Sequence, residues 1–173
     1  MKEIEHGIKN YQTWTATLDL RICGICFRMH GKVYSVTEDI DPTPPLHPRC
    51  RCVIEALKAR PAGTATMRYR DGADWWLKYN GMLPDYYVTL QDAKSFGYRP
   101  LLGNLADILP GKMITKGIYK NKNGHLPSAS GRIWYEADIN YDGGYRGDER
   151  IVFSNDGLVF VTYNPYLTFE EIV

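Results

Sequence analysis

Polar and apolar residues alternate along residues 133–141, a stretch that is rich in β-forming side chains and therefore typical of a strand. Similar runs follow one another through the second half of the chain. About five strands are expected, near residues 113–119, 133–139, 149–154, 158–162 and 168–172. Turn signals separate them, among them Asp-Gly-Gly at 142–144 and Asn-Asp-Gly at 155–157.

Helical signals precede these strands. Thr89 is a good N-cap for a helix that ends before Gly97, and Trp75, Trp76 and Tyr79 are available for the buried side of an earlier helix. About three helices are expected, over residues 71–79, 90–96 and 103–109. Helices followed by a meander of strands predict an α+β architecture with an antiparallel sheet.

The first third of the chain differs in character. Residues 1–20 begin with a polar, helix-compatible stretch, and residues 31–36 read as a short strand. Residues 59–66 are small and include Pro and Gly, which is typical of a linker. The sequence therefore predicts a first unit at 1–58, a linker at 59–68 and a second domain at 69–173.

The cysteines all lie in the first unit, as a Cys-x-x-Cys pair, Cys23 and Cys26, and a Cys-x-Cys pair, Cys50 and Cys52. This spacing lets thiolates point at one ion, and His47 is a fifth candidate ligand for a site that takes four. It predicts a structural zinc site in a reducing compartment rather than a disulfide framework. The alternative is a set of buried free cysteines. Nothing nearby suggests a catalytic zinc.

Net charge is +1 over 173 residues, and the second domain by itself is slightly acidic. The chain as a whole is therefore no electrostatic trap for nucleic acid, and any RNA contact must come from a local basic patch. A hydrophobic content of 44% permits a packed core. No apolar run is long enough for a membrane span, and no secretory signal pattern begins the chain, so no membrane partner is expected.

Glu136, Arg146 and Arg150 surround the strand–turn–strand pattern of residues 130–150. A carboxylate on a rigid strand facing guanidiniums suits phosphodiester chemistry, because the acid takes a proton and the arginines stabilise negative charge on phosphorus. The competing interpretation of these residues is a solvated, ion-paired strand face.

Four motifs decide between the two interpretations: LPDYYVT at 83–89, GNLADILPGK at 103–112, GHLPSASGR at 124–132 and GRIWYEADINY at 131–141. With them, the chain from about residue 69 to residue 173 resembles the barnase-like, guanyl-type ribonucleases. The resemblance implies an RNA substrate that is cleaved by attack of the ribose 2′-hydroxyl. It also implies an acidic immunity or inhibitor protein as a partner.

The resemblance assigns a role to each matching position. Glu136 matches the general base, Arg146 and Arg150 match the phosphate-binding arginines, and Tyr166 matches a tyrosine at the rim of the active site. The loop that reads guanine in the family falls on residues 120–124. Its expected substrate contacts are Asn121, Lys122 and Asn123.

The sequence departs from the family at three positions. Pro165 replaces the histidine that acts as general acid, Leu90 replaces an active-site lysine, and Asn123 replaces a glutamate that binds guanine. Because general acid catalysis is worth about 10² to 10⁴ in rate, a weakened enzyme is expected. The alternative is an inactive RNA-binding or structural appendage. His125 is expected to be an exposed loop residue.

The first unit carries a second resemblance. TWTATLDLRICGICFRMHGKVY at 13–34 and HPRCRC at 47–52 resemble the C-terminal end of phage Mu F-like minor head proteins. Proteins of that family sit at the portal and sometimes carry toxin domains behind this end. The resemblance implies a toxin-type ribonuclease behind a fragment of a prophage head protein, with the phage portal or head as a partner. It implies a cytoplasmic or virion-associated location. A third alternative is a zinc-stabilised interaction module with a passenger domain.

Overall fold

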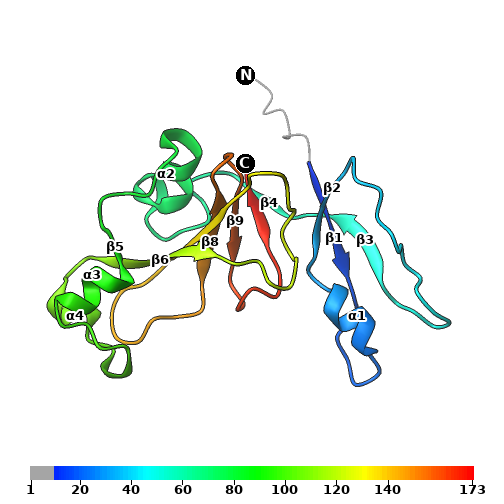
Figure 1. Cartoon of the computed structure of the whole chain (residues 1–173), viewed down its shortest axis with the longest axis horizontal. Coiled ribbons are helices and arrows are strands. Elements are labelled where there is room, and N and C mark those ends of the chain that lie inside the picture. Colours follow the sequence, from blue (N-terminus) through cyan, green and yellow to red (C-terminus); the bar gives the residue numbers. More distant parts are fainter. Residues whose placement is uncertain (1–9) are drawn as a thin grey trace.

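The computed structural model describes residues 10–173, which form two sheets lying side by side (Figure 1). Two expectations concern residues 1–9, which lie outside the described residues: the absence of a secretory signal pattern and part of the polar, helix-compatible opening stretch. Within residues 10–173, no helix is both long and apolar enough to cross a membrane.

The smaller sheet has three antiparallel strands in the order β2-β1-β3. With one short helix it makes up residues 10–57, which we call the N-terminal module. Its core is built around Trp14, which is fully buried against Cys26 and Cys52. The short strand expected at 31–36 is β2. The elements are β1 (Tyr11–Thr15), α1 (Gly24–Met29), β2 (Val33–Ser35) and β3 (Val53–Ala56).

The larger sheet has seven strands, in the order β4-β10-β9-β8-β7-β6-β5. The expected five strands form its antiparallel centre, as predicted. The expectation of about five was too low, because a short strand pairs in parallel at each edge. The strands are β4 (Ala59–Arg60), β5 (Tyr87–Thr89), β6 (Met113–Tyr119), β7 (Trp134–Asp138), β8 (Arg150–Ser154), β9 (Val159–Thr162) and β10 (Glu170–Ile172).

The three expected helices are present, and two 3₁₀ turns flank them. Thr89 is an N-cap, since its hydroxyl accepts a hydrogen bond from Asp92 N at 3.0 Å. Gly97, with φ of +103°, follows the end of that helix. The helices are α2 (Ala73–Asn80), α3 (Leu90–Ser95) and α4 (Leu105–Ile108), and the 3₁₀ turns are Tyr69–Asp71 and Pro100–Leu102.

One residue of α2 does not lie where the sequence placed it. Tyr79 is 62% exposed, whereas Ala73, Asp74 and Leu77 form the buried side of the helix. The ring of Tyr79 instead packs on Trp75 at the surface, with centroids 4.2 Å apart. The expectation failed because an aromatic side chain can cover its neighbour in the previous turn without entering the core.

Residues of the predicted linker pack against the second domain. Residues 59 and 60 form β4, and Ala62 and Ala65 join the core beneath α2. The carboxylate of Asp74, fully buried, accepts hydrogen bonds from Gly63 N at 2.7 Å and Ala65 N at 3.0 Å. The division at 59–68 stays a prediction.

Both faces of the larger sheet are covered, because successive residues of β8 and β9 point to opposite sides. On one face Ile151 packs in a cluster with Leu77 of α2. On the other face Val152 and Phe160 pack in a cluster with Leu57 of the N-terminal module. The second face is the one that carries the candidate active site.

Candidate active site

Glu136 and Asp138 lie two residues apart on β7 and therefore share one face of the sheet. Across the ladder, Glu136 pairs with Val152 and Asp138 pairs with Arg150. Both carboxylates are buried, since Glu136 is 9% exposed and Asp138 is 2% exposed. Two buried acids on one strand require positive partners close by.

Asp138 supplies the contact that holds the two predicted arginines. Arg146 donates to both of its oxygens, from Nε to Oδ2 and from Nη2 to Oδ1 at 2.6 Å. Arg150 Nε lies 3.1 Å from Asp138 Oδ1, without the alignment of a hydrogen bond. Arg150 Nη1 donates to the carbonyl oxygens of Gly147 at 2.6 Å and Glu149 at 2.7 Å. Sequence reasoning had not selected Asp138, although its spacing from Glu136 on a strand was a usable signal.

Tyr166 reaches the predicted base from the loop between β9 and β10. Its hydroxyl donates to Glu136 Oε2, and its ring stacks on Tyr119 with centroids 5.1 Å apart. Burial, followed by the hydrogen bond to Glu136, raises the pKa of this hydroxyl well above its ordinary value. The structure thus brings Glu136, Arg146, Arg150 and Tyr166 together.

Lys116 is a residue of this site that sequence reasoning missed. The pairing of β6 with β7 shifts between Thr115 and Gly117, so Lys116 is the extra residue of a β-bulge. Bulges re-aim side chains beside active sites. Lys116 is exposed, yet its pKa is lowered. The largest cause is partial loss of hydration of its ammonium group, followed by the positive charge of Arg150, whereas the charge of Glu136 acts in the opposite direction.

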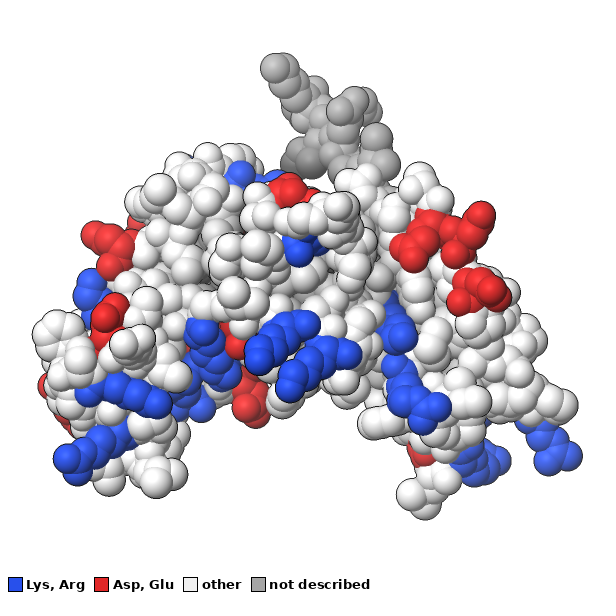
Figure 2. All heavy atoms as spheres, viewed as in Figure 1, with Lys and Arg blue, Asp and Glu red and all other residues white. Residues whose placement is uncertain are grey.

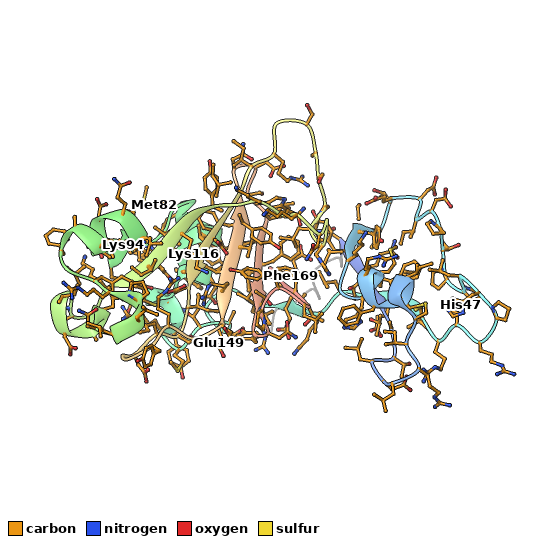
Figure 3. The ribbon with its side chains drawn as sticks, turned by 60° about the horizontal axis from the view of Figure 1, so that its bottom comes forward. His47, Met82, Lys94, Lys116, Glu149 and Phe169 are labelled. Carbon is orange, nitrogen blue, oxygen red and sulfur yellow. The ribbon has the colours of Figure 1, made fainter. Side chains whose placement is uncertain are left out.

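Lys116 lies beside the position where the family's lysine is missing. It lines one groove together with Leu90 and Lys94. Figure 3 shows Lys116 and Lys94 in the part of the chain that carries the larger sheet. Position 90 carries no positive charge in this chain, but Lys116 of the neighbouring strand β6 supplies one to the same groove.

The loop predicted to read a base is a closed turn. Asn121 adopts φ of +45°, and its side chain both donates to Leu126 O at 2.7 Å and accepts from Leu126 N at 3.1 Å. Asn121 therefore holds the loop in shape. Lys122 and Asn123 are exposed at the tip.

His125 is buried, which corrects the expectation of an exposed loop residue. It is 7% exposed, and its Nε2 donates to His30 O of the N-terminal module at 3.0 Å. The sequence of the loop gave no sign of this burial, because the covering surface comes from residues about 95 positions earlier.

The five candidate metal ligands gather in the N-terminal module. His47 Nε2 lies 3.3 Å from the sulfurs of both Cys23 and Cys26, and the sulfurs of Cys26 and Cys50 are 3.8 Å apart. Two groups can hold a metal ion, Cys23 with Cys26 and His47, and Cys26 with Cys50 and Cys52. Cys26 belongs to both. In Figure 3, His47 lies at the end of the module away from Phe169, which lies between the module and the larger sheet.

The chemistry of this donor set suits a tetrahedral ion. Sulfurs bound at about 2.3 Å to one such ion lie about 3.8 Å apart. His47 Nδ1 donates to Pro48 O at 2.9 Å, which leaves Nε2 free to ligate. Hydrogen bonds from the backbone, Cys26 N first, lower the pKa of Cys23 to about 7 and so favour the thiolate that binds metals.

In the larger part of the chain, helices are followed by a sheet, and this sheet presents a carboxylate beside two arginines. This fold and this site are those expected of a small ribonuclease. Residues 76–173, more than half of the chain, match the family described as ribonuclease. The chain belongs to this ribonuclease family. Residues 2–55 match a second family, described as phage Mu protein F like protein.

Curated relatives agree with the larger match. A ribonuclease of Heyndrickxia coagulans is 46% identical over 100 residues, which cover 58% of this chain and 91% of the relative. Ribonucleases of Bacillus intermedius and Bacillus pumilus are each 46% identical over 100 residues, again 58% of this chain. The match spans 61% of the length of these two Bacillus proteins.

Replacing Asp138 tests whether this carboxylate holds the arginines. Asp138→Asn leaves two guanidiniums without a buried counter-charge, and breaking a buried ion pair costs about 3–5 kcal/mol. We expect the free energy of unfolding, measured by urea denaturation, to fall by about 3 kcal/mol. Asp156→Asn is the matched control, because Asp156 pairs with Arg132 but is 46% exposed. It should cost less than about 1 kcal/mol. Equal losses in the two variants would contradict the assignment.

Proposed function

We propose that this protein is an endoribonuclease that cleaves single-stranded RNA by transesterification, with Glu136 as the general base. The observation that carries the proposal is the buried carboxylate of Glu136 on β7, beside two arginines held by Asp138. Membership of the ribonuclease family supports it.

In the proposed reaction, Glu136 accepts the proton of a ribose 2′-hydroxyl, and the resulting oxygen attacks the adjacent phosphorus. The bond from phosphorus to the 5′-oxygen breaks, which leaves a 2′,3′-cyclic phosphate and a 5′-hydroxyl. Arg146 and Arg150 offset the negative charge that builds on the nonbridging oxygens. Tyr166, already bonded to Glu136, positions the carboxylate.

The leaving 5′-oxygen needs a proton, and Pro165 has none to give. Water therefore supplies that proton, which makes cleavage slow. One observation favours a second function, a binding or structural domain without activity. The Tyr166 hydroxyl donates a hydrogen bond to Oε2 of Glu136, the carboxylate that would have to act as base. The experiments below distinguish the two.

Base recognition belongs to the exposed end of the loop. Lys122 and Asn123 face solvent there, and an amide offers one acceptor and one donor where a carboxylate offers only acceptors. We propose that these two side chains contact the base and that Asn121 acts indirectly by closing the turn. Comparing cleavage after each of the four bases checks this, and a flat profile would argue against it.

The same proposal includes a phage setting for the protein and an inhibitor protein as its partner. The match of residues 2–55 supports a phage head setting, with a toxin-type role for the ribonuclease. An acidic inhibitor protein of the kind that accompanies this ribonuclease family is a further hypothesis, motivated by Arg146 and Arg150. Titrating RNA cleavage with such an inhibitor checks it, and an unchanged rate would rule it out.

Restoring a proton donor should restore the rate. Pro165→His is expected to raise cleavage of ordinary RNA by about 10². The same change should matter little for an activated aryl phosphodiester, because its leaving group departs as a stable anion. Glu136→Ala should abolish both reactions. Equal rates on RNA for the wild type, Pro165→His and Glu136→Ala would instead favour the second function.

The cation on β6 should also contribute. Lys116→Met removes a positive charge from beside Glu136 and Arg150, and we expect kcat/KM on RNA to fall about tenfold. Lys116→Arg should retain most of the activity. Lys94→Met is the matched control, since Lys94 lines the same groove. Similar losses from both methionine variants would show that only the general charge of the groove matters.

For the metal cluster we propose one structural zinc. Protein purified without added metal should contain about one zinc per chain by elemental analysis. Cys26→Ser should lose it, because Cys26 belongs to both candidate groups. Separate substitutions of His47 and Cys52 then tell which four residues ligate. A metal-free protein whose near-ultraviolet circular dichroism spectrum is that of the folded protein would refute the site.

A further inference from the structure

The N-terminal module is docked firmly against the loops that border the active site. Val33 N donates to His125 O at 2.7 Å, and His125 Nε2 donates back to His30 O at 3.0 Å. Between them lies Gly31, with φ of +81°, where an added Cβ would come within 1.8 Å of Leu167 O. Leu167 follows Tyr166 directly, so the contact places the module beside the loop between β9 and β10 that carries Tyr166.

This docking creates a groove that neither part has alone, which we call the module groove. Its volume is about 550 Å³, within the range of about 300–1,000 Å³ usual for ligand sites. Phe27, Arg28 and Lys32 line it from the module. The opposite side is lined by Asn123 of the predicted base-reading loop and by Pro165 and Tyr166 of the loop between β9 and β10.

The lining has the chemistry of a site for single-stranded nucleic acid. Phe27 is 53% exposed, so its ring is accessible to a base that enters the groove. Arg28 and Lys32 form no ion pair with any of residues 10–173. No Asp or Glu lines the groove. An exposed ring next to two cations allows a base to stack and its phosphates to bind.

The module groove continues the candidate active site. Tyr166 lines the groove and also donates to Glu136, so the groove begins at the residue that borders the base. Figure 2 shows Lys and Arg side chains along the hollowed underside of the molecule, from the larger sheet across to the module. A bound strand that reaches Glu136 can therefore continue past Tyr166 into a groove lined by Arg28 and Lys32 and by no acidic side chain.

We propose that the N-terminal module forms a second RNA subsite, in which Phe27 stacks on a nucleotide beyond the cleaved bond and Arg28 and Lys32 bind its phosphates. This inference rests on the proposed ribonuclease function. It makes the module part of the substrate-binding surface, so long RNA binds more tightly than a dinucleotide.

Binding by a cleavage-deficient protein tests the subsite. The parent is the full chain with Glu136→Gln, and its ligands are a fluorescein-labelled single-stranded RNA octamer and a labelled dinucleotide. Adding Phe27→Ala and Arg28→Ala should weaken octamer binding, measured by fluorescence anisotropy, about tenfold or more. Dinucleotide binding should change less than about twofold. Loss of one phosphate contact should also reduce the slope of log K against log salt by about 0.7.

The matched control is Leu20→Ala with Arg21→Ala in the same parent. It removes one exposed apolar side chain and one arginine from the module outside the groove, and octamer affinity should not change. Urea denaturation verifies that all variants stay folded. If the parent binds the octamer and the groove variant binds it equally well, the subsite is refuted while the ribonuclease function stands. If the parent binds neither RNA, both proposals fail.

Discussion

The pleat of β7 is the constraint on which the rest of the structure depends. Since side chains alternate along a strand, Trp134, Glu136 and Asp138 share one face. Trp134 joins the hydrophobic cluster under the N-terminal module, whereas Asp138 holds the arginines. A slip of one residue against β8 would turn both acids toward α2 and its apolar cluster, away from Arg150. The same register thus specifies a domain contact and a candidate active site.

Asp138 sets the electrostatic character of that site. One buried carboxylate contacts two guanidiniums, so these three groups together carry a net positive charge while the arginine side chains are held in place. Arg150 Nη1 donates to two backbone carbonyl oxygens, whereas its Nη2 makes none of the side-chain hydrogen bonds found within residues 10–173. Preorganisation of this kind persists without the general acid. The contacts that hold the two arginines do not involve position 165, which is Pro165 in this chain.

Sequence patterns predicted the elements whose cause is local. The central strands, the Thr89 cap and the spacing within each cysteine pair depend on residues close in sequence, and each lies near its expected place. The failures depend on distant partners. Two-residue β4 has no period to detect and exists only because β10 offers a free edge. His125 is buried by a turn from the module, and Lys116 is directed by a bulge that only the pairing with β7 reveals.

The N-terminal module and the larger sheet share one apolar cluster. Two independent domains joined by a linker usually contact each other through a small and polar interface. Here Val33 and Leu57 of the module are buried with Phe160 of β9 and with Phe169, which directly precedes β10, and the ring of Tyr11 packs edge-on against Phe160 with centroids 5.5 Å apart. Removing the module would expose this cluster and free the loop that carries His125. The segment that resembles a phage head protein therefore shares an apolar cluster with the ribonuclease-like part of the chain, and the module groove lies beside Tyr166.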